Sequence, residues 1–350
     1  MRHVVNRLIL LAFFACLVLA APAHAGNIFG PNAGKKLTGV SDNGTMEGFL
    51  DFADAVGKHP AVLQTFHPWG NGLDLAYRRW QAAEVMPMLH ISTADDETLQ
   101  ELITPQDIAR GYGDAYLIEI NRFFAEKNQR AFVRPLGEPN RCLNVYSAVT
   151  CSGRQRGGSH TTYWYRKAFQ RIAVITRGGM SSNRMDRHLN NLRMRKVNWG
   201  SAVRPSTVPA APVSIIWSAL PAGSPRARGN WPGNYWPGSR YVDWAGVDFY
   251  SDYPHWRDLN KFATAKPWRN KPLTLTEWGV AGSDNYVFVR QIFAWMNNRP
   301  RVRMYVYYRG FGGLEDRYNP HNYPVSLRTM KNKLRDPRYL GYAYLHARRP

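Results

Sequence analysis

The sequence alternates between short apolar runs with strand character and longer runs with helical spacing, and this alternation limits the fold most strongly. The strand-like runs are residues 35–40, 61–66, 85–90, 131–136, 213–217, a run within 241–250 that ends at Tyr250, 273–277 and 302–308. The helical runs are residues 46–56, 73–83, 104–126, 162–176, 184–197, 255–263 and 284–298. Alternating strands and helices indicate parallel strands joined by crossovers. Since no change in composition marks a second domain, we predict an α/β fold with one (β/α)8 TIM barrel over residues 26–350. We expect long loops at the C-terminal face of this barrel.

The N-terminus has the features of a secretory signal peptide. Arg2 and Arg7 flank an apolar run over residues 8–20, and Ala23-His-Ala25 is a small-residue cleavage site. The apolar run is too short to span a membrane, and no other segment is a candidate. We predict a signal peptide over residues 1–25 and a secreted protein, extracellular or periplasmic. We expect the mature chain to have no membrane span and to be a monomer.

Two cysteines remain after removal of the signal peptide. Cys142 and Cys151 lie nine positions apart, and in an oxidising compartment they are expected to form a disulfide; two unpaired thiols are the alternative. The ten histidines are scattered without the spacing of a metal site. The sequence therefore predicts neither a bound metal nor a cofactor.

The chain is strongly basic. Its formal charge is +21, which becomes +19 when Arg2 and Arg7 are removed. Such an excess indicates acidic partners. No nucleic-acid-binding motif of the usual kinds is present, so we do not expect nucleic acid as a partner. An anionic glycan or cell surface is the favoured interpretation, and solubility alone is the alternative.

Two glutamates follow strand-like runs and are the candidate catalytic residues. Glu138 lies in the turn that follows residues 131–136, and Glu277 ends the run 273–277. In a barrel, residues at the C-terminal ends of the strands line the active site. Two such acids are what a retaining glycosidase needs. The alternatives are a glutamate in a surface turn for Glu138 and an acid at a helix N-terminus for Glu277. The other candidate site residues at or near strand ends are His67, Trp69, His90, Arg134, Asn140, Trp217, Tyr250 and Trp278.

Four segments together resemble glycoside hydrolase family 26, the β-mannanase family, which belongs to the retaining clan A glycosidases. The segments are Arg134-Pro-Leu-Gly-Glu-Pro-Asn140, Ile216-Trp-Ser218, Trp236-Pro-Gly-Ser-Arg-Tyr-Val-Asp-Trp-Ala-Gly-Val-Asp-Phe-Tyr250 and Pro272-Leu-Thr-Leu-Thr-Glu-Trp-Gly279. The resemblance spans roughly residues 35–310. Two features depart from the family pattern. Gly137 stands where the family usually has histidine, and the loop between Cys142 and Cys151 replaces an aromatic-rich segment.

The resemblance implies a role for several residues. Glu138 matches the acid/base and Glu277 the nucleophile, while Tyr250 matches the tyrosine that donates a hydrogen bond to the nucleophile. Arg134 and Asn140 match polar residues that support the acid/base, and Trp217 matches part of the floor beneath the cleaved sugar. Aromatic side chains such as Trp69 and Trp278 are candidates for stacking on sugar rings.

The implied function is the double-displacement hydrolysis of a β-linked polysaccharide or oligosaccharide, with a β-1,4-mannan cleaved internally as the first expectation. Two alternatives remain open. One is hydrolysis of another β-glycan or of an acidic exopolysaccharide, which the positive charge favours. The other is a barrel that binds glycans without cleaving them.

Overall fold

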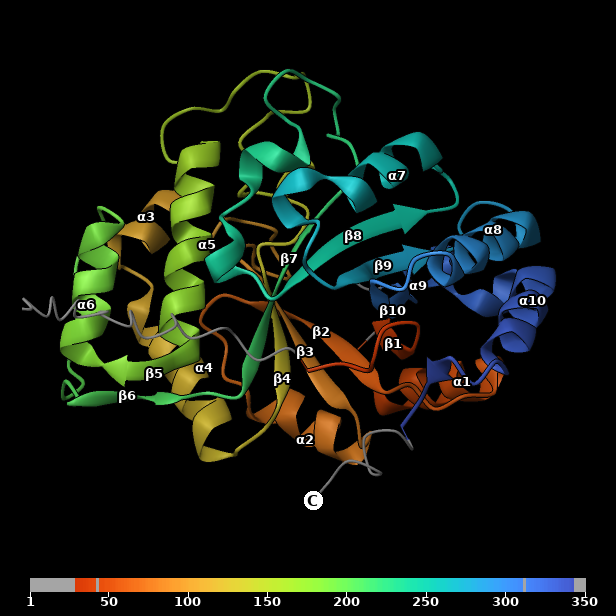
Figure 1. Cartoon of the computed structure of the whole chain (residues 1–350), viewed down its shortest axis with the longest axis horizontal. Coiled ribbons are helices and arrows are strands. Elements are labelled where there is room, and N and C mark those ends of the chain that lie inside the picture. Colours follow the sequence, from red (N-terminus) through yellow and green to blue (C-terminus); the bar gives the residue numbers. More distant parts are fainter. Residues whose placement is uncertain (1–28, 42–43, 311–312, 343–350) are drawn as a thin grey trace, which may run out of the picture.

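The protein folds into a closed barrel of parallel strands surrounded by helices (Figure 1). The structure is a computed structural model that describes residues 29–41, 44–310 and 313–342; the predicted signal peptide lies outside these residues. Eight parallel strands form the barrel within the described residues, and pairing of β10 with β1 closes it. They are β1 Lys36–Ser41, β2 Val62–Pro68, β3 Met86–Ser92, β4 Ala131–Pro135, β7 Val213–Ala219, β8 Trp244–Tyr250, β9 Leu273–Gly279 and β10 Val302–Tyr308. The prediction of a single (β/α)8 barrel is confirmed.

Helices cover the outside of the barrel. Figure 1 shows α3, α5 and α6 on one side and α1, α8 and α10 on the opposite side. The α-helices are α1 Met46–Val56, α2 Asp74–Ala82, α3 Pro105–Arg110, α4 Asp114–Glu126, α5 Thr162–Arg177, α6 Ser182–Asn191, α7 Trp256–Thr264, α8 Tyr286–Asn297, α9 Glu315–Tyr318 and α10 Pro324–Leu334. None of the helices in the described part of the chain has the length and apolar character needed to cross a membrane.

Capping residues explain where the sequence prediction of helices was right and where it was wrong. Helix α1 has the predicted bounds, because Thr45 caps its first turn and Gly57 ends it in the left-handed conformation. The single helix predicted over residues 104–126 is wrong. Gly111, with φ of 92°, ends α3, and α4 starts afresh at Asp114.

The prediction missed several short elements. Strands β5 Gly178–Ser181 and β6 Thr207–Ala210 form a small antiparallel sheet beside α6, and β11 Tyr339–Leu340 pairs with the start of β1. Short 3-10 turns occur at Pro232–Tyr235, Ser239–Tyr241, Lys266–Trp268 and Pro320–Asn322. These strands and 3-10 turns have two to four residues each, which is too short for a periodic pattern. The prediction also missed α10, which has eleven residues.

The barrel interior changes from apolar to polar along the strands. The floor, toward the N-terminal ends of the strands, is closed by Leu37, Ala61, Val62, Met88, Phe132, Ile216, Trp244, Met304 and Val306. The layer above it, toward the C-terminal ends, holds the buried polar side chains of Gln64, His90, Arg134, Ser218, Asp248, Thr276 and Glu277. Buried charged groups require partners, so this polar layer is where a functional site is expected.

Candidate active site

The turn after β4 positions Glu138 at the mouth of the barrel. Leu136 and Glu138 both have φ of 50°, a left-handed conformation that L-residues rarely adopt. The surrounding structure therefore has to hold this turn in place, as is common at functional sites. Its hydrogen bonds run from the Tyr165 hydroxyl to Leu136 O (3.0 Å), from the Tyr146 hydroxyl to Gly137 O (2.6 Å), from Asn144 Nδ2 to Glu138 O (2.9 Å) and from Glu138 N to Ser218 O (3.2 Å).

Gly137 has no room for a side chain. A Cβ atom at this position would lie 2.8 Å from Arg134 Nη2 and 2.9 Å from His90 Nε2. His90 is buried, and its Nε2 accepts a hydrogen bond of 3.3 Å from the Gly137 N–H. Burial, followed by the nearby Arg134 guanidinium, lowers the pKa of His90 well below its ordinary value. A neutral His90 thus stands close to the place where the family usually has a histidine on the turn itself.

Glu277 reaches the same pocket from β9. The pairing of β9 with β8 shifts register next to Asp248 and Glu277, which marks a β-bulge. The bulge lets the consecutive side chains of Thr276 and Glu277 both point into the barrel. Glu277 Oε1 accepts hydrogen bonds from Arg134 Nη1 and from Gln64 Nε2 (3.3 Å), and Oε2 accepts one of 2.5 Å from the Tyr250 hydroxyl.

Glu138, Asp248 and Glu277 converge. One carboxylate oxygen of each lies within 4.8 Å of one from each of the others. The separation of the two glutamates is compatible with the roughly 5–5.5 Å found between the carboxyl groups of retaining glycosidases. Among the described residues these three acids could offer oxygen ligands to a metal ion. However, the Arg134 guanidinium already binds Asp248 Oδ2 and Glu277 Oε1 and supplies the positive charge there.

The position of Arg134 corrects its expected role. Its side chain is fully buried, donates to Ser218 Oγ (2.7 Å) and Gln64 Oε1 (3.0 Å), and is paired with Asp248 and Glu277. A side chain without exposed surface does not bind substrate. Arg134 supports the nucleophile candidate Glu277 and not, as expected, the acid/base candidate Glu138.

Burial gives Glu138 the properties of a proton donor. The pKa of Glu138 is raised, first by burial and then by repulsion from Glu277, while Arg141 and Arg134 oppose this shift. The Arg141 Nη1 lies 3.3 Å from Glu138 Oε2. Burial also raises the pKa of Asp248 well above its ordinary value, although Arg134 is bound to it. By contrast, Glu277 accepts hydrogen bonds from three donors, which stabilise a negative charge.

Three further residues predicted to bind substrate are buried in the wall of the barrel. Strand alternation turns Trp217 away from the barrel axis, where it packs against Trp236, Trp268 and Phe262. Trp278 likewise packs outward against Phe288, Phe293, Tyr305 and Tyr307. Both indoles have zero exposure, so in this structure neither presents a surface on which a sugar ring could stack. Asn140 is also buried and links the turn to the β7 loop through Leu220 N (2.9 Å) and the carbonyls of Leu220 (3.0 Å) and Ala222 (3.2 Å).

Trp69 directly follows β2 and Tyr250 ends β8, whereas His90 lies two positions before the end of β3. Trp69 is 9 % exposed and packs on Tyr116. Tyr250 keeps partial exposure and lies against Tyr308 and Tyr318. The last two tyrosines add an aromatic wall beside Glu277 that the sequence interpretation missed.

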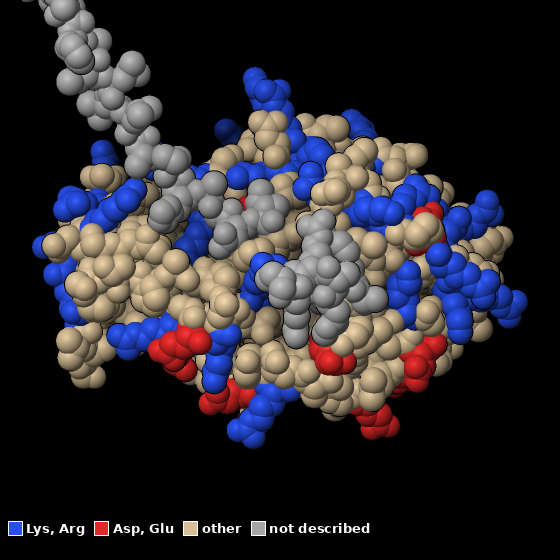
Figure 2. Space-filling model, turned by 60° about the horizontal axis from the view of Figure 1, so that its bottom comes forward, with Lys and Arg blue, Asp and Glu red and all other residues tan. Residues whose placement is uncertain are grey.

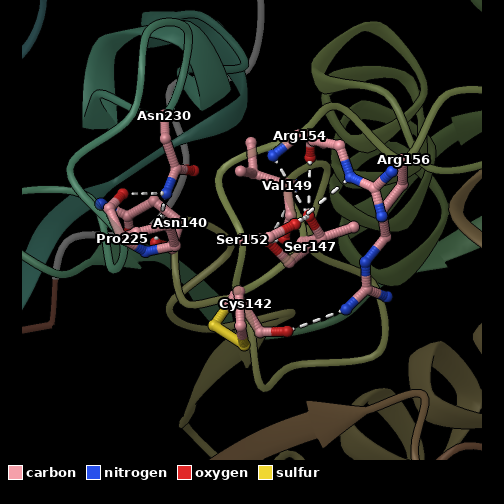
Figure 3. Close-up of a disulfide and its surroundings, with 11 residues drawn as sticks. Asn140, Cys142, Ser147, Val149, Ser152, Arg154, Arg156, Pro225 and Asn230 are labelled. Carbon is pink, nitrogen blue, oxygen red and sulfur yellow. Dashed lines mark hydrogen bonds between the residues drawn. A yellow bond between two sulfur atoms is a disulfide. The ribbon is translucent and has the colours of Figure 1, made fainter.

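The predicted disulfide between Cys142 and Cys151 is confirmed. Figure 3 shows it at the base of a loop that Arg156 ties together by donating to Cys142 O (2.8 Å) and Val145 O (2.6 Å). Cys142 N also donates to Ser224 O (2.7 Å), and Asn230 Nδ2 donates to Asn140 O (3.0 Å). The loop therefore fixes Asn144 and Tyr146, which in turn hold the carbonyls of the Glu138 turn.

Asp248 and Gln64 are the main residues of the site that sequence reasoning missed. Both contact Arg134. A signal was present, because each is a polar residue inside a strand that is otherwise buried, and such residues are seldom buried without a partner. The partner, however, comes from a distant strand and is not visible in the sequence.

Comparisons with known proteins support the fold. No model of a known protein family matches the sequence, and no curated protein matches it. Among solved structures, a family 26 β-mannanase from Bacteroides ovatus has a similar fold (TM-score 0.58, 17 % identity, covering 88 % of this chain and 91 % of that chain). The catalytic domain of a family 26 endo-β-1,4-mannanase from a Bacillus species is also similar (TM-score 0.57, 14 % identity, covering 88 % of this chain and 88 % of that chain). A family 26 protein from a Muricauda species is similar too (TM-score 0.54, 14 % identity, covering 89 % of this chain and 92 % of that chain). The resemblance to family 26 inferred from the four segments is thus confirmed at the level of the fold.

Proposed function

We propose that the protein is a retaining glycoside hydrolase that cleaves a β-linked polysaccharide. The observation that carries this proposal is the meeting of Glu138 and Glu277 at the C-terminal mouth of the barrel with different hydrogen-bond partners. Glu138 is buried with a raised pKa, whereas Glu277 accepts three hydrogen bonds. One carboxyl group is therefore suited to hold a proton and the other to carry a charge, which is the division of roles that retention requires.

In the first step Glu277 attacks the anomeric carbon of the sugar. Glu138 gives its proton to the glycosidic oxygen as the bond to the leaving sugar breaks, so that no free alkoxide forms. The product is an ester between the sugar and Glu277. Arg134, Gln64 and the Tyr250 hydroxyl hold the Glu277 carboxylate in position for this attack.

In the second step Glu138, now a carboxylate, takes a proton from a water molecule. This water attacks the anomeric carbon from the side that the leaving sugar has vacated, and the ester bond to Glu277 breaks. Two inversions at the same carbon give net retention. Both carboxyl groups return to their starting protonation states.

The finer part of the proposal concerns substrate and location. The similar structures named above include an endo-β-1,4-mannanase and a β-mannanase, and this supports a mannan-type backbone as the first substrate to test. The aromatic wall formed by Tyr250, Tyr308 and Tyr318 supports binding of sugar rings beside Glu277. We further propose that residues 1–25 direct export and that the mature protein acts outside the cytoplasm.

Replacement of each glutamate, followed by addition of azide, tests both roles. Glu277→Ala should lower the hydrolysis rate on a soluble β-1,4-glucomannan on the order of 10⁴-fold or more, and Glu138→Ala about 10²- to 10⁴-fold. Azide fits the space left by a carboxylate. It should give an α-glycosyl azide with Glu277→Ala, after a single displacement, and a β-glycosyl azide with Glu138→Ala, after a double displacement.

Exchange of the two azide products between the variants would reverse the assignment of roles. Full activity of Glu277→Ala on a polysaccharide that the wild type cleaves would contradict the proposal. Tight glycan binding without any product from a panel of β-glycans would favour a binding barrel instead.

A further inference from the structure

Arg141 occupies an unusual position beside the acid/base candidate. It follows Asn140 directly and begins the loop that the disulfide closes. Its guanidinium is 3.3 Å from Glu138 Oε2, and its side chain is 41 % exposed. Arg141 is therefore a cation at the mouth of the barrel, in contact with a proposed catalytic group and open to a ligand.

The pairing of other arginines at this end of the barrel sets Arg141 apart. Arg309, which follows β10, binds Asp51 Oδ2 at 2.6 Å, and Arg317 in α9 binds Asp252 Oδ2 at 2.6 Å. Arg134 is neutralised by Asp248 and Glu277. Within the described part of the chain, the carboxylate paired with Arg141 is that of Glu138 itself.

This pairing works against the proposed chemistry in the absence of substrate. The Arg141 charge lowers the pKa of Glu138 and so opposes the effect of burial. A general acid must carry its proton when substrate is bound. A substrate that draws the guanidinium to itself would weaken the Arg141–Glu138 pair and favour protonation of Glu138.

We propose that Arg141 is a specificity-determining residue that binds a carboxylate carried by the polysaccharide next to the cleaved bond. The substrate class is then an acidic β-glycan, with a uronic acid or a carboxyl-bearing substituent on a β-linked backbone. Arginine suits this role because its planar guanidinium binds carboxylates through two parallel hydrogen bonds. This inference rests on the proposed function of the same site.

The charge of the whole molecule favours the same class of substrate. The chain has 46 Lys and Arg against 25 Asp and Glu. Figure 2 shows Lys and Arg spread widely over one face, whereas Asp and Glu are confined to a few places, mostly toward its lower edge. A positive field raises the local concentration of an anionic polymer, while Arg141 would provide the specific contact.

Two oligosaccharides of equal length provide the test. β-1,4-linked mannohexaose and the hexamer of β-1,4-linked mannuronate differ only in the oxidation state of C6. Their dissociation constants would be measured by calorimetry with the Glu277→Gln variant, which keeps the shape of the site and retains Glu138. We expect the mannuronate hexamer to bind about tenfold or more tightly than mannohexaose, because charge-assisted hydrogen bonds are the strong ones. Adding Arg141→Gln should abolish most of this preference.

Arg154→Gln is the matched control. Arg154 lies three positions beyond Cys151 in the same connection between β4 and α5. It bonds to Ser152 Oγ (3.3 Å), so its replacement removes the same charge without touching Glu138. The control should keep most of the preference for mannuronate. Equal binding of the two hexamers, a preference that survives Arg141→Gln, or an equal loss in Arg154→Gln would each overturn the role of Arg141.

The same variants separate this inference from the proposed function. If the wild type cleaves glucomannan and Glu277→Ala does not, but Arg141→Gln leaves the mannuronate preference intact, the inference alone fails. If binding depends on Arg141 but the wild type cleaves no β-glycan in the panel, the proposed function fails while the acidic-glycan site stands.

Discussion

At the scale of single residues, two glutamate side chains are given different protonation and hydrogen-bonding roles by their neighbours. Glu138 is buried with Arg141 as its charged partner, whereas Glu277 is surrounded by Arg134, Gln64 and Tyr250. The sequence predicted both glutamates because each follows a strand-like run. It could not predict how their partners are shared, since Arg134 was expected to support Glu138 and instead binds Glu277.

The pH dependence of activity follows from the raised pKa of Glu138. A general acid works only while protonated, so kcat/KM should fall as pH rises through this pKa. Besides Arg141, the charged groups that face Glu138 are Glu277, Arg134 and Asp248. Because Arg141 lowers the pKa of Glu138, Arg141→Gln should move the alkaline limb of the kcat/KM pH profile, measured with a neutral glycan, to higher pH. A limb that stays in place or moves to lower pH would contradict this account of Glu138.

The same shift predicts a pH-dependent effect of Glu138→Gln on stability. The pKa of Glu138 is higher in the folded than in the unfolded state. Its contribution to the free energy of unfolding is therefore fully present below the pKa of the unfolded state and is lost as pH rises through the pKa of the folded state. Glu138→Gln removes this loss. The variant should therefore gain thermal stability over the wild type as pH rises, measured by melting curves across a pH series. A gain in thermal stability confined to acidic pH would contradict the predicted direction.

At the scale of elements, the turn from Leu136 to Asn140 decides whether the site forms. The structure holds it from the disulfide loop, from α5 and from the β7 loop. The sequence indicated the turn itself through its glycine and prolines. The supporting contacts come from residues up to 90 positions away in the chain, and no local pattern predicts them.

Gly137→Ala tests how closely the turn is packed. The added Cβ would approach Arg134 and His90 to below 3.0 Å. Since Arg134 also holds Glu277, we expect a loss of about 1–3 kcal/mol in the free energy of unfolding together with a large fall in activity. Gly233→Ala is the control, because nothing lies within 4 Å of a Cβ there. Urea denaturation and kcat would be measured for both, and equal behaviour of the two variants would refute the packing argument.

The disulfide should matter for the site as well as for stability. Cys142→Ser with Cys151→Ser opens a loop of nine positions, for which chain entropy predicts a loss of about 2–3 kcal/mol. The loop carries Asn144 and Tyr146, which bind the carbonyls of Gly137 and Glu138. We therefore expect kcat to fall at temperatures where the variant is still folded, as judged by circular dichroism. Unchanged kcat would show that the turn holds without the disulfide.

At the scale of the whole molecule, alternation along the sequence predicted the barrel well. All eight barrel strands were predicted, and the bounds of β10 and α1 agree with the structure. Which side of a strand faces the axis was harder to predict. Trp217 and Trp278 point outward, whereas the bulge in β9 turns Glu277 inward against simple alternation. The short β5, β6 and β11 strands lack a pattern long enough to detect.

Retention of configuration is the central claim, and the proton NMR spectrum of the first products tests it most directly. The wild-type protein would be mixed with a soluble β-glycan that it cleaves, and the anomeric signals would be followed before mutarotation equilibrates them. The account predicts that the β-anomer of the new reducing end appears first, with no comparable release by Glu277→Ala. Initial release of the α-anomer, or equally fast release by Glu277→Ala, would contradict it.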